Sequence, residues 1–376
     1  MYHRIISKQI KDNFFKGKAI IIVGPRQVGK TTLSLEIIKK YNKKDVIKFN
    51  CDNPGDRETL NNRDIEFLAK IIGKAKIIFI DEGQKVKTIG QTLKLLIDHF
   101  GKSKQILTTG SSSFNLIDKT SEALTGRKFI YHLYPLSFEE IFQEKNILDF
   151  KKELEIFMIF GNYPEIVKEQ SNEERIERLK NLASSYLYKD ILEFQNIKNS
   201  DVLGKLLKAL ALQIGSEVSY TELSNLIGVD KKTIERYVDL LEKNFIIFRL
   251  PPYFRNKRKE ISKLRKIYFY DLGIRNAIIN NFNFFDSRND QGQLWENLAI
   301  IERMKYQAYH KIYSNNYFWR AYNRAEVDFI EERNGKLYGF ELKWGAKKGR
   351  IPQEWQKNKN SEYKIISPDD VVGFWL

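Results

Sequence analysis

The sequence is poor in cysteine and has no long run of apolar residues. Its single cysteine, Cys51, excludes an intramolecular disulfide framework and a cysteine-based zinc site. No apolar segment approaches the roughly 20 residues that a membrane-spanning helix requires. Residues 1–15 lack the apolar core of a secretory signal peptide. These absences predict a cytoplasmic protein that makes no membrane contact.

Acidic residues are too few to balance the basic ones. The 376 residues include 64 Lys and Arg against 48 Asp and Glu, which gives a net charge of +16. Such a surface attracts phosphate polymers. Lys, Asn and Ile are all plentiful, however, as a compositionally biased genome would also produce. Charge therefore leaves a nucleic-acid partner and a compositional bias as alternatives.

Residues 19–32, AIIIVGPRQVGKTT, contain a phosphate-binding pattern. An apolar run that reads as a buried strand stops at Gly24, and Gly29-Lys30-Thr31 then opens a segment with helical spacing. In this spacing backbone N–H groups surround phosphates, Lys30 reaches the β- and γ-phosphates, and Thr31 offers its hydroxyl to Mg²⁺. The predicted ATP-binding residues are Gly24, Pro25, Arg26, Gln27, Val28, Gly29, Lys30, Thr31 and Thr32.

A second acidic motif follows about fifty residues later. The apolar residues Ile77–Ile80 lead into Asp81-Glu82, the arrangement called Walker B. Asp81 at a strand tip can hold Mg²⁺, while Glu82 can orient the attacking water as a catalytic residue. The alternative is that both acids are solvated loop residues.

Two further residues belong to the same prediction. Residues 105–109 form a short apolar run followed by Gly110-Ser111, so the Ser111 hydroxyl is expected to face the γ-phosphate. Arg127 is a candidate arginine finger, although a surface arginine explains it equally well. Strands alternate with helices up to about residue 140, which predicts a mostly parallel, helix-covered α/β sheet.

These motifs resemble a known family. GPRQVGKTT, FIDE, TTGSSS, LTGR, YPLSFEE and GNYPE occur in the order found in AAA-type ATPases of bacteria and archaea that carry a C-terminal domain of unknown function. YLYKDIL, KIYFYDLGIRN and the EVDF and FELK segments extend the resemblance over most of the chain. It implies an AAA-type core with Gly110-Ser111-Ser112 in the sensor-1 position, followed by helical lid segments.

Residues 201–250 predict three helices and a β-rich segment. The helices are expected at 203–212, 220–227 and 231–244, in the order of a winged helix-turn-helix. The third helix begins with the predicted DNA-binding residues Lys231, Lys232, Thr233 and Arg236, and a basic stretch follows at 255–266. Winged helices also serve as spacers and dimerisation modules, so DNA contact and a structural role are both open.

A hairpin is predicted in AEVDFIEERNGKLYGFELKW, with its turn at Asn334-Gly335. Counting outward from Arg333 and Lys336 places Asp328 opposite Glu341. The same register puts Val327 and Phe329 on the apolar face. Two carboxylates opposite each other repel unless a cation lies between them, which suggests a metal.

This hairpin resembles the core of PD-(D/E)xK nucleases. The resemblance implies Glu296, Asp328 and Glu341 as metal ligands and Lys343 as a catalytic residue that activates water. The alternative is a solvated hairpin face with an ion pair between Glu326 and Lys343. Inactive relatives of this fold are common.

The sequence therefore predicts an ATPase core (1–145), a helical lid and hinge (146–200), a winged helix (201–265) and a nuclease-like domain (266–376). ATP and Mg²⁺ are the expected cofactors and DNA the expected partner, with a metal-dependent nuclease activity to be tested. The first alternative is a nucleotide-dependent switch whose C-terminal domain only holds a protein partner. The second is an ATPase acting on RNA or a transposon complex. A homo-oligomer fits each of them.

Overall fold

The computed structural model describes residues 2–111, 120, 123–142, 147–195, 200–254, 265–321, 325–345, 351–358, 360–371 and 373–375. Two compact units are present: residues 1–135 with 243–245, and residues 136–242 with 246–376. The first division of the chain therefore lies at Pro135, ten residues before the predicted boundary. The three later predicted segments fall almost entirely within the second unit.

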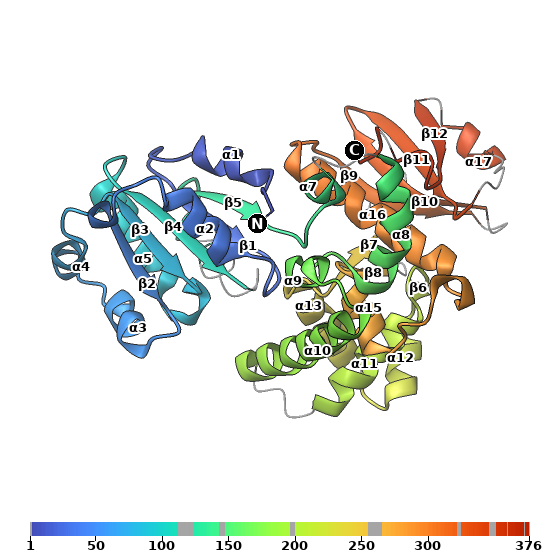
Figure 1. Cartoon of the computed structure of the whole chain (residues 1–376), viewed down its shortest axis with the longest axis horizontal. Coiled ribbons are helices and arrows are strands. Elements are labelled where there is room, and N and C mark those ends of the chain that lie inside the picture. The colour runs from blue at the N-terminus through green and yellow to red at the C-terminus, as the bar shows by residue number, and fades with distance from the viewer. Residues whose placement is uncertain are drawn as a thin grey trace. The chain divides into compact units, whose positions relative to one another are not determined.

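A parallel sheet of five strands forms the centre of the first unit, in the order β2-β3-β4-β1-β5 (Figure 1). The strands expected at 19–23, 77–80 and 105–109 are present. Every residue of β1 and β4 is buried, as expected for strands in the middle of a helix-covered sheet. The strands are β1 (Ala19–Val23), β2 (Val46–Asn50), β3 (Ile77–Asp81), β4 (Gln105–Gly110) and β5 (Lys128–His132).

Within its described residues the first unit has the helices α1 (Ile6–Lys11), α2 (Lys30–Ile38), α3 (Pro54–Asn61), α4 (Ile65–Ile72) and α5 (Ile89–Phe100), with short 3₁₀ turns η1 (Lys43–Asp45) and η2 (Gly83–Lys85). Residues 53–55 form the start of α3. Asn53 caps this helix, because its side chain accepts a hydrogen bond from the Gly55 N–H, and Pro54 occupies the first helical position.

Helices dominate the first part of the second unit. They are α7 (Phe138–Ile141), α8 (Ile147–Phe160), α9 (Pro164–Lys168), α10 (Asn172–Gln195) and α15 (Leu272–Ile278). A capping box is present at α7, where Ser137 and Glu140 each accept a hydrogen bond from the other's backbone N–H. Helix α15 packs against both α8 and α10.

In the part of the segment after α10 that the structure describes, there are a three-stranded antiparallel sheet and three helices. The helices are α11 (Ser200–Leu212), α12 (Tyr220–Ile227) and α13 (Lys231–Lys243), close to the predicted bounds. The strands β6 (Glu217–Val218), β7 (Ile247–Leu250) and β8 (Arg265–Phe269) pair in the order β6-β8-β7. Of the predicted basic stretch 255–266, only its last two residues lie within the described part of the chain.

The C-terminal part contains a four-stranded sheet in the order β12-β11-β10-β9. Its strands are β9 (Asn315–Arg320), β10 (Glu326–Arg333), β11 (Lys336–Leu342) and β12 (Ser361–Ile366), with helices α16 (Gln291–Tyr309) and α17 (Gln353–Gln356) and the 3₁₀ turn η4 (Phe285–Ser287). Helix α16 contacts both β8 and β11, so it joins the three-stranded and four-stranded sheets.

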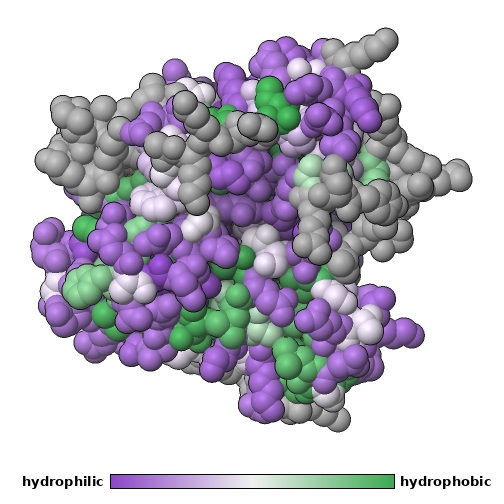
Figure 2. All heavy atoms as spheres, turned by 90° about the vertical axis from the view of Figure 1, so that its right-hand side faces the viewer, coloured by the Kyte–Doolittle hydropathy of each residue, from purple (hydrophilic) through white to green (hydrophobic). Residues whose placement is uncertain are grey.

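The surface of the second unit drawn in Figure 2 is mostly hydrophilic, with hydrophobic side chains in separate patches. Among the helices of the described residues, none combines the length and apolar character needed to cross a membrane.

Candidate nucleotide site and carboxylate cluster

The loop between β1 and α2 lies at the carboxyl edge of the parallel sheet. Gln27 (φ 58°) and Gly29 (φ 94°) have left-handed backbone conformations, which turn the loop back toward the helix. Within the described residues no side chain caps the N-terminus of α2. The first N–H groups of this helix can therefore meet an anion, as the spacing of the two glycines predicts. Of the other predicted loop residues, Val28 is buried and Thr32 is exposed.

Lys30 lies inside this loop and is only 5% exposed. Its Nζ donates to the carbonyl oxygens of Gly24 (3.0 Å) and Pro25 (2.6 Å). The ammonium is thus held by the backbone that would surround the phosphates. Phosphate oxygens could take over from these two carbonyls as its acceptors.

Asp81 connects three elements at the end of β3. Its carboxylate accepts hydrogen bonds from Thr31 Oγ1, at 2.9 and 3.0 Å, and from Thr109 Oγ1. Thr31 is the second residue of α2, and Thr109 lies near the end of β4. A hydroxyl beside a carboxylate is the donor set that holds Mg²⁺ in P-loop proteins, so these residues fit that ion.

Thr109 was not among the predicted site residues. It also accepts a hydrogen bond from the backbone N–H of Glu82, at 3.1 Å. The sequence signal that could have found it is its place at the carboxyl end of a central strand, two residues before Ser111.

The carboxylate of Glu82 is held by two polar side chains. Gln84 donates from Nε2 to Glu82 Oε2 (2.5 Å) and to Ser111 Oγ (2.9 Å), and Ser111 donates to the same Glu82 oxygen (3.2 Å). Ser111 was expected to face the γ-phosphate, but here its partner is Glu82. The adjoining Ser112 lies outside the described residues.

Arg127 is at the opposite edge of the sheet from the phosphate-binding loop. The next residue, Lys128, pairs with Ala19 at the start of β1, whereas the loop follows Val23 at its end. Four strand steps of about 3.3 Å separate the two edges by about 13 Å. The Nε of Arg127 pairs instead with Asp98 (2.9 Å) in an exposed position. The arginine-finger role of Arg127 thus stays a prediction only for a nucleotide that is bound to another copy of the chain.

The predicted hairpin turn is present in the second unit. Asn334 (φ 51°) and Gly335 (φ 71°) both have positive φ, as the two central residues of a type I′ turn require. The predicted register holds from Arg333 with Lys336 to Phe329 with Phe340. This part of the sequence-based hairpin is therefore confirmed.

Beyond Phe329 the strand departs from the predicted pattern. The register of β10 against β9 shifts between Val327 and Ile330. Val327 consequently shares a core cluster with Ile330, while Phe329 packs against Phe340, so the two do not belong to one continuous apolar face as expected. Asp328 accepts a hydrogen bond from the N–H of Leu342, at 2.8 Å.

Lys266 lies among the acidic residues that the sequence assigned to a metal. Its side chain, on β8, is 4% exposed, and its Nζ is 2.9 Å from Glu296 Oε1 and 3.9 Å from Asp328 Oδ1. It also pairs with Glu326. Tyr268 on the same strand donates its hydroxyl to the same Glu296 oxygen, at 2.5 Å. We call Lys266, Glu296, Glu326 and Asp328 the carboxylate cluster.

Burial and charge act in opposite directions on this lysine. Burial alone would lower the pKa of Lys266, but the charges of Glu296, Asp328 and Glu326 raise it, so the ammonium stays protonated. Burial raises the pKa of Asp328 well above its usual range, and the nearby charge of Glu296 raises it further. Lys266 opposes that effect and stabilises the carboxylate.

The predicted metal site of Glu296, Asp328 and Glu341 does not form in this structure. Across the described part of the chain, no group of three or more His, Cys, Asp or Glu side chains is arranged to hold a metal ion. The physical reason is that Lys266 supplies the cation for Glu296 and Asp328. The cluster residues therefore do not fit a divalent ion in this conformation.

Lys343, the predicted catalytic residue, is also paired. Its Nζ lies 2.5 Å from Glu341 Oε1, and the other oxygen of Glu341 accepts a hydrogen bond from Tyr363 (3.3 Å). The alternative pair of Glu326 with Lys343 does not form either, because Glu326 pairs with Lys266.

The predicted DNA-binding residues lie on the first turns of α13. Lys231, Lys232 and Arg236 are exposed. Thr233 has a local structural role, because its N–H and hydroxyl both donate to Asp230 (2.9 and 2.7 Å) and so anchor the start of the helix.

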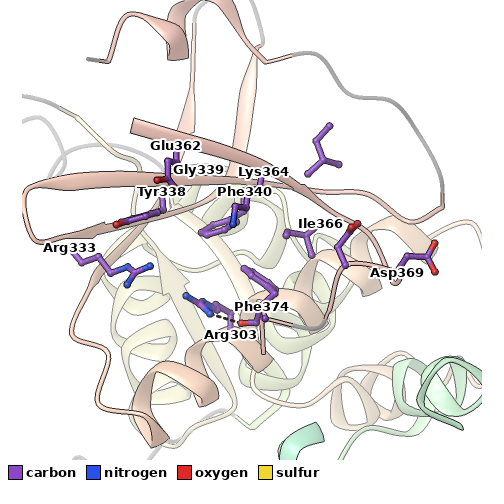
Figure 3. A pocket seen from close by; sticks show the side chains of 13 residues that line it. Arg303, Arg333, Tyr338, Gly339, Phe340, Glu362, Lys364, Ile366, Asp369 and Phe374 are labelled. Atoms are coloured by element: carbon purple, nitrogen blue, oxygen red, sulfur yellow. Dashed lines mark hydrogen bonds between the residues drawn. The ribbon is translucent and has the colours of Figure 1, made fainter. Parts of the chain in front are cut away.

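A cavity of about 640 Å³ lies elsewhere in the second unit, lined by residues of β11 and β12 and by Asp369, Asp370, Gly373 and Phe374 (Figure 3). Its lining includes Arg303, whose guanidinium is bonded to Glu331 and to the carbonyl oxygen of Phe374. None of the carboxylate-cluster residues lines it. The cavity is thus separate from the predicted nuclease-like site.

Three family models match successive parts of the chain. An AAA domain matches residues 16–142, a domain of unknown function (DUF8612) matches 151–284, and a second domain of unknown function (DUF4143) matches 291–368. The AAA match covers the phosphate-binding loop and the Walker B strand. The N-terminal part is therefore AAA-like in both sequence and sheet architecture.

Relatives with curated sequences match over most of the chain. An uncharacterized protein of Mycobacterium tuberculosis is 25% identical over 342 residues, covering 90% of this chain and 73% of that protein. An uncharacterized protein of Methanocaldococcus jannaschii is 28% identical over 348 residues, covering 87% and 75%. Their similarity extends through both units.

Two solved structures are similar at a low level. A signal transduction ATPase with numerous domains and a tetratricopeptide repeat sensor, from Pyrococcus horikoshii, gives a TM-score of 0.31 at 13% identity. The match covers 83% of this chain and 48% of that one. The Drosophila origin recognition complex bound to AT-rich DNA and Cdc6 gives 0.26 at 8% identity, covering 73% and 92%. Values this low do not establish a common fold over the whole chain.

Proposed function

We propose that the first unit binds ATP with Mg²⁺ and hydrolyses it. The observation that carries this proposal is the convergence of Lys30, Thr31 and Asp81 at the carboxyl edge of the parallel sheet. Thr31 and Asp81 would hold Mg²⁺, which neutralises phosphate charge when bound. Lys30 would bind the β- and γ-phosphates, and the first N–H groups of α2 would surround them.

Glu82 is the residue proposed to orient the attacking water. Its carboxylate lies next to Asp81 in sequence and is fixed by Gln84 and Ser111. A carboxylate held in one orientation can accept a hydrogen bond from a water aligned with the γ-phosphate. Glu82 would then act on the water, while Lys30 and Thr31 act on the phosphate.

The second unit is proposed to contact DNA through a winged helix. Its element order α11-β6-α12-α13-β7-β8, with a three-stranded antiparallel sheet, supports this assignment. Lys231, Lys232 and Arg236 are exposed on the helix that would approach the phosphate backbone. A spacer role is the alternative for the same arrangement.

For the C-terminal part, Lys266 favours the non-enzymatic alternative over a nuclease. A buried ammonium already pairs with Glu296, Glu326 and Asp328, and it also connects β8 to α16 and β10. The cluster then acts as an ionic connection within an interaction module. A nuclease remains the second candidate, because Lys343 pairs with Glu341 and the charge of Asp328 also acts on it.

Two substitutions test the ATPase proposal. Lys30→Ala removes the phosphate cation and should abolish ATP binding, whereas Glu82→Gln should bind ATP with Mg²⁺ like the unaltered protein and lose turnover at least about a hundredfold. Fluorescent nucleotide titration measures the first effect and phosphate release the second. Equal ATP affinity in Lys30→Ala, or normal turnover in Glu82→Gln, would contradict the proposal.

A further inference from the structure

Arg4 joins two segments of the first unit that are far apart in sequence. It is 6% exposed and lies just before α1. One guanidinium nitrogen donates to the carbonyl oxygen of Val28 (2.8 Å), and the other donates to that of Tyr134 (2.7 Å). Val28 belongs to the phosphate-binding loop, and Tyr134 directly precedes the division between the units at Pro135.

The contact with Val28 bears on phosphate binding. In a trans peptide the carbonyl of one residue and the N–H of the next point in opposite directions. By holding the Val28 carbonyl, Arg4 therefore fixes the direction of the Gly29 N–H, one of the groups proposed to face phosphate. Without this hydrogen bond the peptide between Val28 and Gly29 would be freer to rotate.

The phosphate-binding loop also contacts residues 133–138, which we call the connecting segment. The N–H of Leu133 donates to Val23 O (2.8 Å), and a Cβ at Gly24 would lie 2.0 Å from Leu133 O. Only glycine allows that approach. The start of the phosphate-binding loop and the connecting segment are therefore in direct contact.

Immediately after Pro135 the segment is anchored within the second unit. Leu136 O accepts hydrogen bonds from Lys305 Nζ and Asn162 Nδ2, both at 3.0 Å, and the Leu136 N–H donates to Asn162 O (2.9 Å). The N–H of Phe138 donates to Glu302 (2.9 Å). Lys305 and Glu302 belong to α16, the helix that also carries Glu296.

We propose that Arg4 is a positioning residue that links nucleotide binding to the connecting segment. The inference rests on the proposed ATP binding at the loop of the first unit. It names the contacts through which bound ATP would act on the second unit. When phosphate orders the loop, the Val28 carbonyl, Arg4 and the Tyr134 carbonyl become ordered together. Because Leu136 is fixed to α16, the change is passed to the second unit through the chain at Pro135.

Arg4→Lys tests this role. A lysine keeps the charge but lacks the planar fork that reaches two carbonyl oxygens at once. The matched control is Arg57→Lys, because Arg57 also donates to two backbone carbonyls of the first unit, those of Cys51 (3.1 Å) and Asp52 (3.3 Å). Hydrogen exchange of peptides covering residues 133–138 is measured with and without saturating ATP and Mg²⁺.

In the unaltered protein and in Arg57→Lys, ATP should slow exchange in the connecting segment several-fold. Arg4→Lys should bind ATP about tenfold more weakly and show no slowing there even when saturated. Retained slowing in Arg4→Lys, or no ATP effect on the segment in the unaltered protein, would overturn the inference. Failure of the unaltered protein to bind ATP would overturn the proposed function as well. Should Arg4→Lys melt far below the control, Arg4→Gln, which keeps one donor group, takes its place with the same expected results.

Discussion

Gly83 is closely packed beside the candidate nucleotide site. A Cβ at this position would lie 2.6 Å from Thr108 Oγ1. The preceding residue, Glu82, adopts a left-handed backbone conformation (φ 52°, ψ 42°). The Asp81-Glu82 pair could be predicted from sequence because an apolar strand precedes it. The glycine's role could not, because it depends on the neighbouring strand β4.

The first prediction concerns the contribution of Lys266 to the stability of the fold. Replacing it in Lys266→Met removes the cation from Glu296, Glu326 and Asp328, and breaking a buried ion pair costs roughly 3–5 kcal/mol. We expect the variant to be less stable than the unaltered protein by about that amount at pH 8. Urea unfolding measures the free energy of unfolding.

The pH dependence of this loss has a definite sign. The folded state raises the pKa of Lys266, so its contribution is fully present below the unfolded value near 10.5 and disappears only at higher pH. The raised pKa of Asp328 means that its protonation favours the folded state as pH falls. The loss in Lys266→Met should therefore be smaller at pH 5 than at pH 8.

Lys343→Met is the matched control for this experiment. Lys343 is also paired with a glutamate, but its side chain is 37% exposed. Its replacement should cost much less and show little dependence on pH. Equal stability of Lys266→Met and the unaltered protein at pH 8 would contradict a buried ionic cluster.

Sequence could not identify Lys266 as part of this cluster. Its nearest acidic partner in the chain, Glu296, is 30 residues away and belongs to a different element. In the sequence it is the last residue of a basic stretch, which indicates charge but no buried partner. Burial of this lysine depends on β8 meeting α16, a tertiary contact that local pattern does not encode.

Strand β10 shows how far the strand pairing could be predicted by counting outward from the turn. The Asn334-Gly335 turn fixes the pairing as far as Phe329 with Phe340. The shift between Val327 and Ile330 then arises from pairing with β9, which the hairpin sequence does not contain. Strands β1 and β3 of the first unit were predictable because each contains a continuous apolar run.

Helix α13 carries the prediction for DNA. Changing Lys231, Lys232 and Arg236 together to Ala removes three cations from its first turns. We expect DNA affinity to fall at least about tenfold, and the salt dependence of binding to decrease by up to about three charges, since each phosphate contact releases counterions. Fluorescence anisotropy with duplex DNA at several salt concentrations measures both.

The control for this triple variant lowers the net charge equally at another surface. Lys180, Lys205 and Lys208 are exposed lysines of α10 and α11. Their joint replacement by Ala should change DNA affinity much less. Equal losses of DNA affinity in the two triple variants would mean that binding depends only on the total positive charge, and that α13 is a spacer.

At the scale of the whole molecule, Arg127 offers a test of assembly. It lies at the sheet edge remote from its own phosphate-binding loop. If Arg127 of one copy serves the nucleotide of another, Arg127→Ala alone should lose ATP turnover, and mixing it with Lys30→Ala should restore part of it. If ATP turnover does not recover at any mixing ratio, in samples shown to associate, Arg127 has only its surface ion pair with Asp98.

The most direct test of the account is steady-state ATP hydrolysis with and without duplex DNA. We predict Mg²⁺-dependent turnover that DNA increases in the unaltered protein, no turnover in Glu82→Gln, and no increase by DNA when Lys231, Lys232 and Arg236 are Ala. Turnover that is identical with and without DNA, or ATP hydrolysis that survives in Glu82→Gln, would contradict an ATPase in the first unit that responds to DNA at the second.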